Sequence, residues 1–102
     1  MNDFEDENEA GSDSAVEFEL PPKYKVVLLN DDFTTKDFVV YVLVDIFKKS
    51  ELDAEKIMES VHQSGKGVAG VYPYDIAATK ARMTMDKARG NGFPLKCVLE
   101  KE

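Results

Sequence analysis

The sequence predicts a small α+β fold with a three-stranded antiparallel sheet, three helices packed on it and the element order β-α-α-β-α-β. Three observations support this prediction. Short apolar runs typical of strands lie at 23–30, 66–72 and 95–99. Segments with apolar residues at helical spacing and with helix-ending signals lie between them. The length of 102 residues leaves room for a single domain, so the helices and strands should share one core.

The chain divides into two regions at Pro21 and Pro22. Residues 1–20 contain eight acidic residues and no Lys or Arg, and they have few large apolar side chains. Such a segment buries too little apolar surface to offset its ordering entropy. We therefore expect a flexible acidic extension over 1–21 and a folded core domain over 22–102.

The first strand is predicted over 23–30, because this run is apolar and rich in β-branched residues. Thr34 should cap the following helix, since Asp37 lies three residues later at the capping-box spacing. The helix is predicted over 35–49. Lys48 and Lys49 would then complement the helix dipole in its last turn.

The second helix is predicted over 54–64, with Asp53 as its N-cap and Gly65 as the residue that ends it. Its apolar residues fall along one side together with His62. The remaining elements are a weaker strand, a third helix and a last strand, predicted over 66–72, 74–90 and 95–99.

Composition and motifs exclude several functional classes. The net charge is −7, but the acidic extension accounts for −8, so the core is nearly neutral and indicates no nucleic-acid surface. No apolar stretch reaches the roughly 18 residues of a membrane span, and no signal peptide is visible. The lone Cys97 favours a reducing, cytoplasmic compartment. Phosphate-binding glycine loops, nucleophile elbows and Cys-x-x-Cys pairs are missing, so we expect neither an enzyme nor a cofactor.

Polar residues at the end of the first strand form the candidate site. Asn30, Asp31 and Asp32 follow the strand directly. On local evidence alone a simple turn is favoured for these residues, and a partly buried core residue for His62. If the second helix packs near the end of this strand, all four residues would converge and could receive a small cation attached to a hydrophobic group. A metal site built from the two aspartates and His62 is conceivable but has few ligands, and Cys97 fits core packing better than a pair with His62.

The chain resembles the ClpS family, the adaptors of the bacterial Clp protease that recognise N-degrons. The resemblance covers about residues 22–101 in the right order and without a gap. It rests on the following stretches: PKYKVVLLNDDFT at 22–34, DFV at 37–39, VHQSGK at 61–66, GVY at 70–72, AATKA at 77–81 and PLKCVLEK at 94–101.

This resemblance implies that the protein binds the first residue of a substrate polypeptide and delivers it to ClpA or a related AAA+ unfoldase, as a monomer and with help from the acidic extension. The residues implied to hold the α-amino group and first peptide unit are Asn30, Asp31, Asp32, Thr34 and His62. Those implied to line the hydrophobic pocket are Val39, Met58, Val61 and Leu95. Those implied to dock on the N-terminal domain of the unfoldase are Asp75 and Lys80.

One position departs from the family pattern. Where many relatives have Thr-Pro-Met, with the methionine acting as a gate at the pocket rim, this chain has Thr34, Thr35 and Lys36. Lys36 can lay its methylene groups along the rim and keep its ammonium group in water. We therefore expect altered discrimination between β-branched and unbranched first residues. A specialised or decoy adaptor, with narrowed peptide specificity and a mainly modulating effect on the unfoldase, is the alternative.

Overall fold

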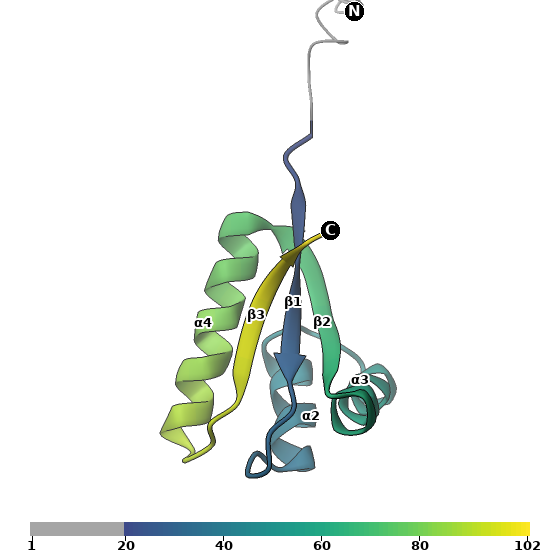
Figure 1. Ribbon diagram of the computed structural model, residues 1–102, viewed down its shortest axis with the longest axis vertical. Helices are drawn as coiled ribbons and strands as arrows, with labels where there is room; N and C mark the ends of the chain where they lie inside the picture. Colours follow the sequence, from purple (N-terminus) through teal and green to yellow (C-terminus); the bar gives the residue numbers. More distant parts are fainter. Residues whose placement is uncertain (1–19) are drawn as a thin grey trace, which may run out of the picture.

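The computed structural model describes residues 20–102, so the predicted flexibility of the extension concerns residues that lie almost wholly outside this range. The predicted element order β-α-α-β-α-β is confirmed (Figure 1). The elements are β1 (Lys23–Leu29), α2 (Lys36–Asp45), α3 (Glu51–Ser64), β2 (Lys66–Pro73), α4 (Tyr74–Gly90) and β3 (Lys96–Lys101).

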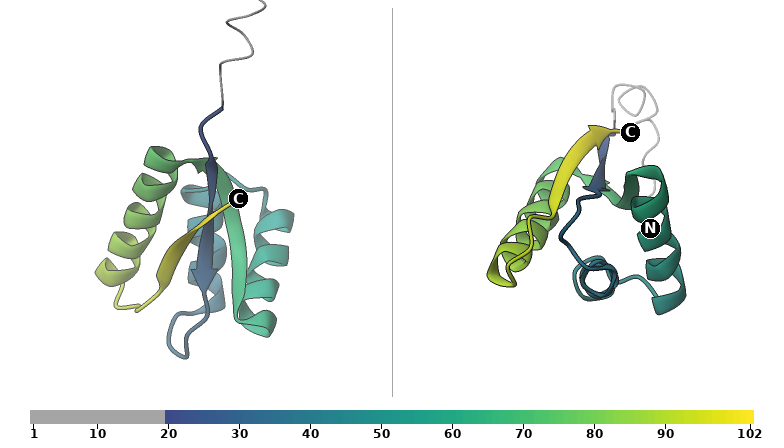
Figure 2. Two further views of the ribbon diagram at one scale, coloured as in Figure 1. Left: turned by 45° about the horizontal axis from the view of Figure 1, so that its top comes forward. Right: turned by 60° about the horizontal axis from the view of Figure 1, so that its bottom comes forward.

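The three strands form one antiparallel sheet with the order β2-β1-β3, so β1 pairs with both neighbours. The three helices lie on one side of this sheet, with α4 beside α2 and α3 on the far side of α2 (Figure 2). The side chains of Val26 and Leu28 in β1 are fully buried in the core that the helices cover. Burial of such apolar surface is the main force that holds the two layers together.

The first helix differs from its prediction at both ends. Thr35, not Thr34, is the N-cap, and its hydroxyl oxygen accepts a hydrogen bond from the Phe38 amide at 3.1 Å. The hydroxyl of Thr34 instead donates to the Asp31 carboxylate and belongs to the preceding turn. The helix also ends at Asp45, four residues before the predicted end at 49.

The early end of α2 has a visible cause. Lys48 adopts a left-handed backbone with φ of 58°, which interrupts the helical path. The prediction that Lys48 and Lys49 occupy the last turn was therefore wrong. The ammonium group of Lys80 in α4 instead donates to the carbonyl oxygen of Ile46, at 2.8 Å, and supplies the positive charge at this helix end.

The second helix begins three residues earlier than predicted. Ser50 is its N-cap and accepts from the Asp53 amide at 3.1 Å, so Asp53 lies inside the first turn instead of capping it. Gly65 ends the helix as predicted, with a left-handed φ of 92° that favours glycine.

The remaining elements match their predictions closely. The third helix has the predicted bounds, while β1 ends one residue early and β3 begins one residue late. Cys97 belongs to the core, where burial raises the pKa of its thiol to about 12, and this confirms its packing role. Within residues 20–102, no helix has the length and apolar character that crossing a membrane requires.

Candidate functional site

The end of β1 is joined to the end of α3 by one main-chain hydrogen bond. The amide of Asn30 donates to the carbonyl oxygen of Gly65 at 2.9 Å. Gly65 in turn donates its amide to Val61, which closes the last turn of α3. His62 lies in this last turn, so the polar residues that follow β1 lie beside the imidazole. The convergence considered from the sequence is present.

A second glycine sets the distance between α3 and the sheet. A Cβ atom added to Gly67 in β2 would lie 2.8 Å from the Cγ2 atom of Val61 and 3.1 Å from the carbonyl oxygen of Ile57. Any larger residue would therefore push α3 outward. Gly67 allows Val61 and its neighbour His62 to stay close to the end of β1.

These elements enclose a cavity of about 250 Å³ between the end of β1, the start of α2 and the end of α3. The cavity is lined by Asn30, Asp31, Asp32, Thr34, Lys36, Val39, Met58, Val61 and His62. Nine of the ten residues assigned from the sequence to amine binding and to the pocket thus meet in one place. Leu95 is the exception: it is buried in the core and does not line the cavity.

Asp31 organises the polar loop. One carboxylate oxygen accepts from the amides of Phe33 and Thr34 at 2.8 and 2.7 Å, and the other accepts from the Thr34 hydroxyl at 2.7 Å. Partial burial raises the pKa of this carboxyl, but the hydrogen bonds from Thr34 and Phe33 outweigh it, so the pKa lies below its ordinary value. Asp31 is therefore charged at neutral pH and holds the loop in shape.

Three other polar residues of the cavity are not used in this way. Within the described part of the chain, no protein hydrogen bond engages the side chains of Asn30, Asp32 or His62. All three are exposed at the cavity. An amide oxygen, a carboxylate and a neutral imidazole nitrogen can accept hydrogen bonds, so this group can receive a ligand that carries several N–H donors.

The cavity also has an apolar part. Val39 and Val61 are 5% and 3% exposed, and Met58 is half-buried beside them. Lys36, the first residue of α2, is exposed and lines the same cavity, as expected of a rim position. The arrangement therefore combines hydrogen-bond acceptors with a hydrophobic wall and one cationic side chain.

The two residues assigned to unfoldase docking lie in α4, which begins where β2 ends, and neither lines the cavity. Asp75 is exposed in the first turn, and its carboxylate accepts from the Ile76 amide at 3.0 Å. Besides its hydrogen bond to Ile46, the Lys80 ammonium group lies 5.4 Å from the centre of the Tyr72 ring. Lys80 thus has a structural role within the domain that the sequence did not reveal.

A second hollow of about 530 Å³ lies on the other side of the polar loop. It shares Asn30, Asp31 and Asp32 with the first cavity and is completed by Leu29, Phe33, Pro94 and Lys96. Sequence reasoning assigned none of these last four residues to a site. Phe33 could have been found from the sequence, because an aromatic residue inside a polar loop belongs to no helix or strand face. In the structure its side chain is 74% exposed, which is typical of a binding surface.

Across residues 20–102, no three His, Cys, Asp or Glu side chains are grouped so that they could hold a metal ion. Asp31, Asp32 and His62 therefore do not form a ligand cluster of that kind, although all three line one cavity.

Comparisons with known proteins agree with this geometry. The family described as "ATP-dependent Clp protease adaptor protein ClpS" matches residues 19–98. ClpS adapter proteins of Acetivibrio thermocellus and Treponema denticola are each 52% identical, over 85% and 79% of this chain and 88% and 80% of their own lengths.

A solved structure is similar as well. Agrobacterium tumefaciens ClpS2 bound to L-phenylalaninamide superimposes with a TM-score of 0.78 and 42% identity, over 81% of this chain and all of that one. These relatives are named for an adaptor role, not for an enzymatic one. The chain belongs to the ClpS family of Clp protease adaptor proteins.

Proposed function

We propose that this adaptor binds the free α-amino group and the large hydrophobic first side chain of N-degron substrates and delivers them to an AAA+ Clp unfoldase. The observation that supports the proposal is the composition of the smaller cavity, where acceptors without internal partners adjoin an apolar wall. The ligand of the Agrobacterium relative, L-phenylalaninamide, has the matching chemistry: an amino group next to an aromatic side chain.

Asn30, Asp32 and His62 would hold the amino group and the first peptide unit. An α-amino group has a pKa near 8 and is mostly charged at neutral pH. Hydrogen bonds to a charged group contribute about 1.5–3 kcal/mol each. An internal residue of a polypeptide has no ammonium group and would leave these acceptors unpaired, so only a free N-terminus satisfies the site.

Val39, Met58 and Val61 would contact the first side chain. Burial of a Leu- or Phe-sized group contributes about 1.5–3 kcal/mol, which alone does not exceed the cost of association. Affinity therefore requires both the hydrogen bonds to the ammonium group and the burial of the first side chain. This dual requirement selects a bulky residue at a free N-terminus. Leu95, which is buried in the core and does not line the cavity, would not touch the ligand.

Asp31 and Thr34 would act together in forming the loop. Both oxygens of the Asp31 carboxylate already accept hydrogen bonds from Phe33 or Thr34. Their contribution to binding is then to keep Asn30 and Asp32 in place, with Asp31 adding negative charge near the ammonium group.

Delivery would use the other end of the domain. Asp75 is exposed at the start of α4 and is available to the N-terminal domain of ClpA or a related unfoldase. Lys80 would fix the position of α4 through its bond to Ile46 and thereby present this surface. We place the protein in the cytoplasm as a monomer that binds neither nucleic acid nor membranes, in agreement with its nearly neutral core and single buried thiol.

Calorimetry with a short peptide that begins with Phe or Leu tests the binding proposal. Acetylation of the peptide amine should abolish the heat of binding, and His62→Ala should weaken binding by about ten- to hundredfold, the equivalent of one charge-assisted hydrogen bond. Gln63→Ala is the matched control, because Gln63 is exposed on the same helix turn and does not line the cavity. Equal affinity for free and acetylated peptides would contradict the proposal.

The presence of Lys36 at the cavity supports a second candidate, a specialised adaptor with narrowed peptide specificity that mainly modulates the unfoldase. Its ammonium group disfavours a cationic ligand close by, which would limit the set of accepted peptides. Titration with peptides that differ only in the first residue separates the two candidates. Measurable binding of Phe, Leu, Tyr and Trp peptides alike favours a general adaptor.

A further inference from the structure

The face of the sheet that points away from the helices has an apolar centre and a basic edge. The strand register places Val27 between Val68 of β2 and Val98 of β3 on this face. Val68 and Val98 are 41% and 40% exposed, and Val71, also on this face, is 37% exposed. No helix covers this surface in residues 20–102 (Figure 2). We refer to it as the outer sheet face.

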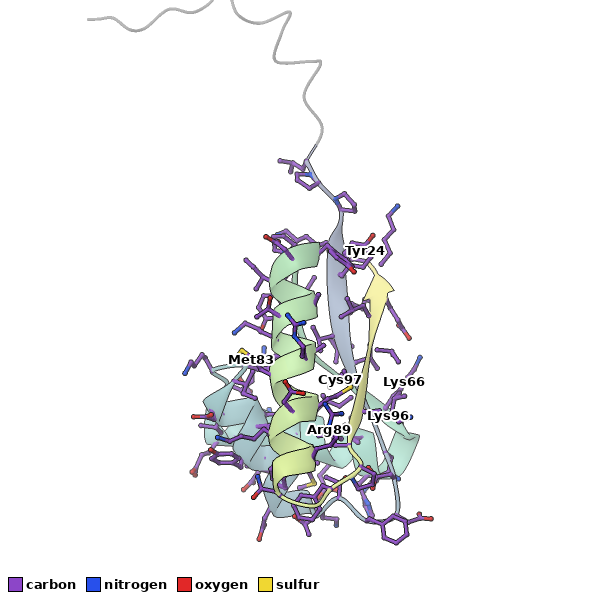
Figure 3. The ribbon with its side chains drawn as sticks, turned by 90° about the vertical axis from the view of Figure 1, so that its left-hand side faces the viewer. Tyr24, Lys66, Met83, Arg89, Lys96 and Cys97 are labelled. Carbon is purple, nitrogen blue, oxygen red and sulfur yellow. The ribbon has the colours of Figure 1, made fainter. Side chains whose placement is uncertain are left out.

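Four lysines surround these valines. Lys23 and Lys25 belong to the first half of β1, whereas Lys66 and Lys96 both pair with Leu29 at its other end. Figure 3 shows Lys66 and Lys96 on the side of β3 that faces away from the helices. Two acids lie on the same face: Glu100 lies 3.6 Å from the Lys66 ammonium group, and Glu102 follows β3 opposite Lys23, to whose carbonyl oxygen its amide donates. The side chains of this surface therefore have a net charge of +2.

The sequence supplies an acidic partner for this surface in the same chain. Residues 3–9 contain five acids and one large apolar residue, Phe4, and no basic residue. We propose that this segment, residues 3–9, binds the outer sheet face of its own domain. Its carboxylates would pair with the lysines, while Phe4 would cover part of the exposed valine surface.

The length of the intervening chain fits this contact. Thirteen residues lie between Glu9 and Lys23, and a coil of that length spans about 20 Å. The seven residues of β1 extend over about 24 Å. The acidic segment can therefore reach the lysines at the far end of the strand. Tethering at this distance gives the acidic segment a millimolar effective concentration at the outer sheet face. Weak charge pairing is then sufficient for binding within the same chain.

Paramagnetic relaxation enhancement measured by NMR on the full chain tests the proposal. A nitroxide is attached at Asn8→Cys, which leaves all five acids intact. Cys97 stays unlabelled, because it is buried and its thiol pKa is raised to about 12. The decisive amides are those of Lys66 and Lys96, far from the point where the extension joins β1. They should lose at least half of their intensity, whereas the amide of Tyr41, which is exposed on α2 in the helix layer, should not.

Charge variants and salt show whether the contact is electrostatic. Lys25→Glu with Lys96→Glu should restore the intensities at least twofold, and so should 1 M NaCl, where the screening length is about 3 Å. The control Lys56→Glu with Arg82→Glu changes the net charge equally on exposed helix positions and should have no effect. Dispersed amide spectra verify that each variant is folded.

Two results would overturn the proposal. The first is an enhancement that fades evenly with distance from residue 23 and is unchanged in salt. The second is signal loss in a mixture where the nitroxide and the ¹⁵N label are on different molecules, which would assign the surface to a second copy of the chain.

Discussion

The two ends of the domain use polar residues in opposite ways. Where β1 ends, Asn30, Asp32 and His62 face a cavity, and their side chains have no hydrogen-bond partner within residues 20–102. At the start of α4, Lys80 is fully engaged by Ile46 and by two aromatic rings. The comparison teaches that a polar residue is available for binding when the fold leaves its hydrogen bonds unmade. Four predictions test this difference, beginning with the largest effect.

Replacement of Lys80 by Met should destabilise the domain by about 1–3 kcal/mol, because it removes a charged donor and leaves the buried Ile46 carbonyl without its partner. Peptide affinity should stay the same. Urea unfolding and calorimetry measure the two quantities, and Lys56→Met on the exposed side of α3 is the control. A stability equal to that of the parent would show that the Lys80 contact is not structural.

The opposite result is expected for Asp32→Asn. This change should weaken the binding of a Phe-initiated peptide by about tenfold or more, since the hydrogen bond to the ammonium group loses its ionised acceptor and the attraction between opposite charges. The free energy of unfolding should change by less than about 0.5 kcal/mol, as for most exposed positions. A large loss of stability would place Asp32 among the structural residues and remove the contrast with Lys80.

A pH titration tests the structural role of Asp31. Hydrogen bonds from Thr34 and Phe33 hold the pKa of the Asp31 carboxyl below its ordinary value despite the opposing effect of burial. The stabilisation from this carboxylate is therefore present above about pH 4 and is lost as the pH falls through the lowered folded-state pKa. In urea unfolding, the parent should exceed Asp31→Asn in stability at pH 6, and the gap should shrink by pH 3. A constant gap would contradict this origin.

The smallest effect is expected at the rim. Lys36→Met should alter the relative affinities for Leu and Ile peptides by a few-fold without changing the requirement for a free amine, because only the side-chain end of the cavity is affected. The measurement is a set of calorimetric titrations on both proteins. Identical rank orders in the two would show that Lys36 does not influence specificity.

Much of this structure could be predicted from the sequence because it depends on local patterns. Element order follows from hydrophobic periodicity, and Gly65 ended α3 as its conformational freedom predicts. Helix starts were less certain. Thr34 and Thr35 are equally suited to capping, and only the turn formed by Asp31 decides between them.

Features that depend on distant contacts could not be predicted. The role of Lys80 rests on a hydrogen bond between residues 34 positions apart. Leu95 illustrates the same limit within the site: its apolar character suits either a pocket wall or the core, and only its packing in the folded chain assigns it to the core.

The bond between Asn30 and Gly65 has a consequence for when the adaptor can work. It joins residues on β1 and at the end of α3, so the receptor exists only after both have docked. Under the proposed function, a nascent or partly unfolded copy would not bind a substrate peptide, and bound peptide would in turn favour the native state by mass action. The ability to bind a peptide would therefore depend on completion of folding.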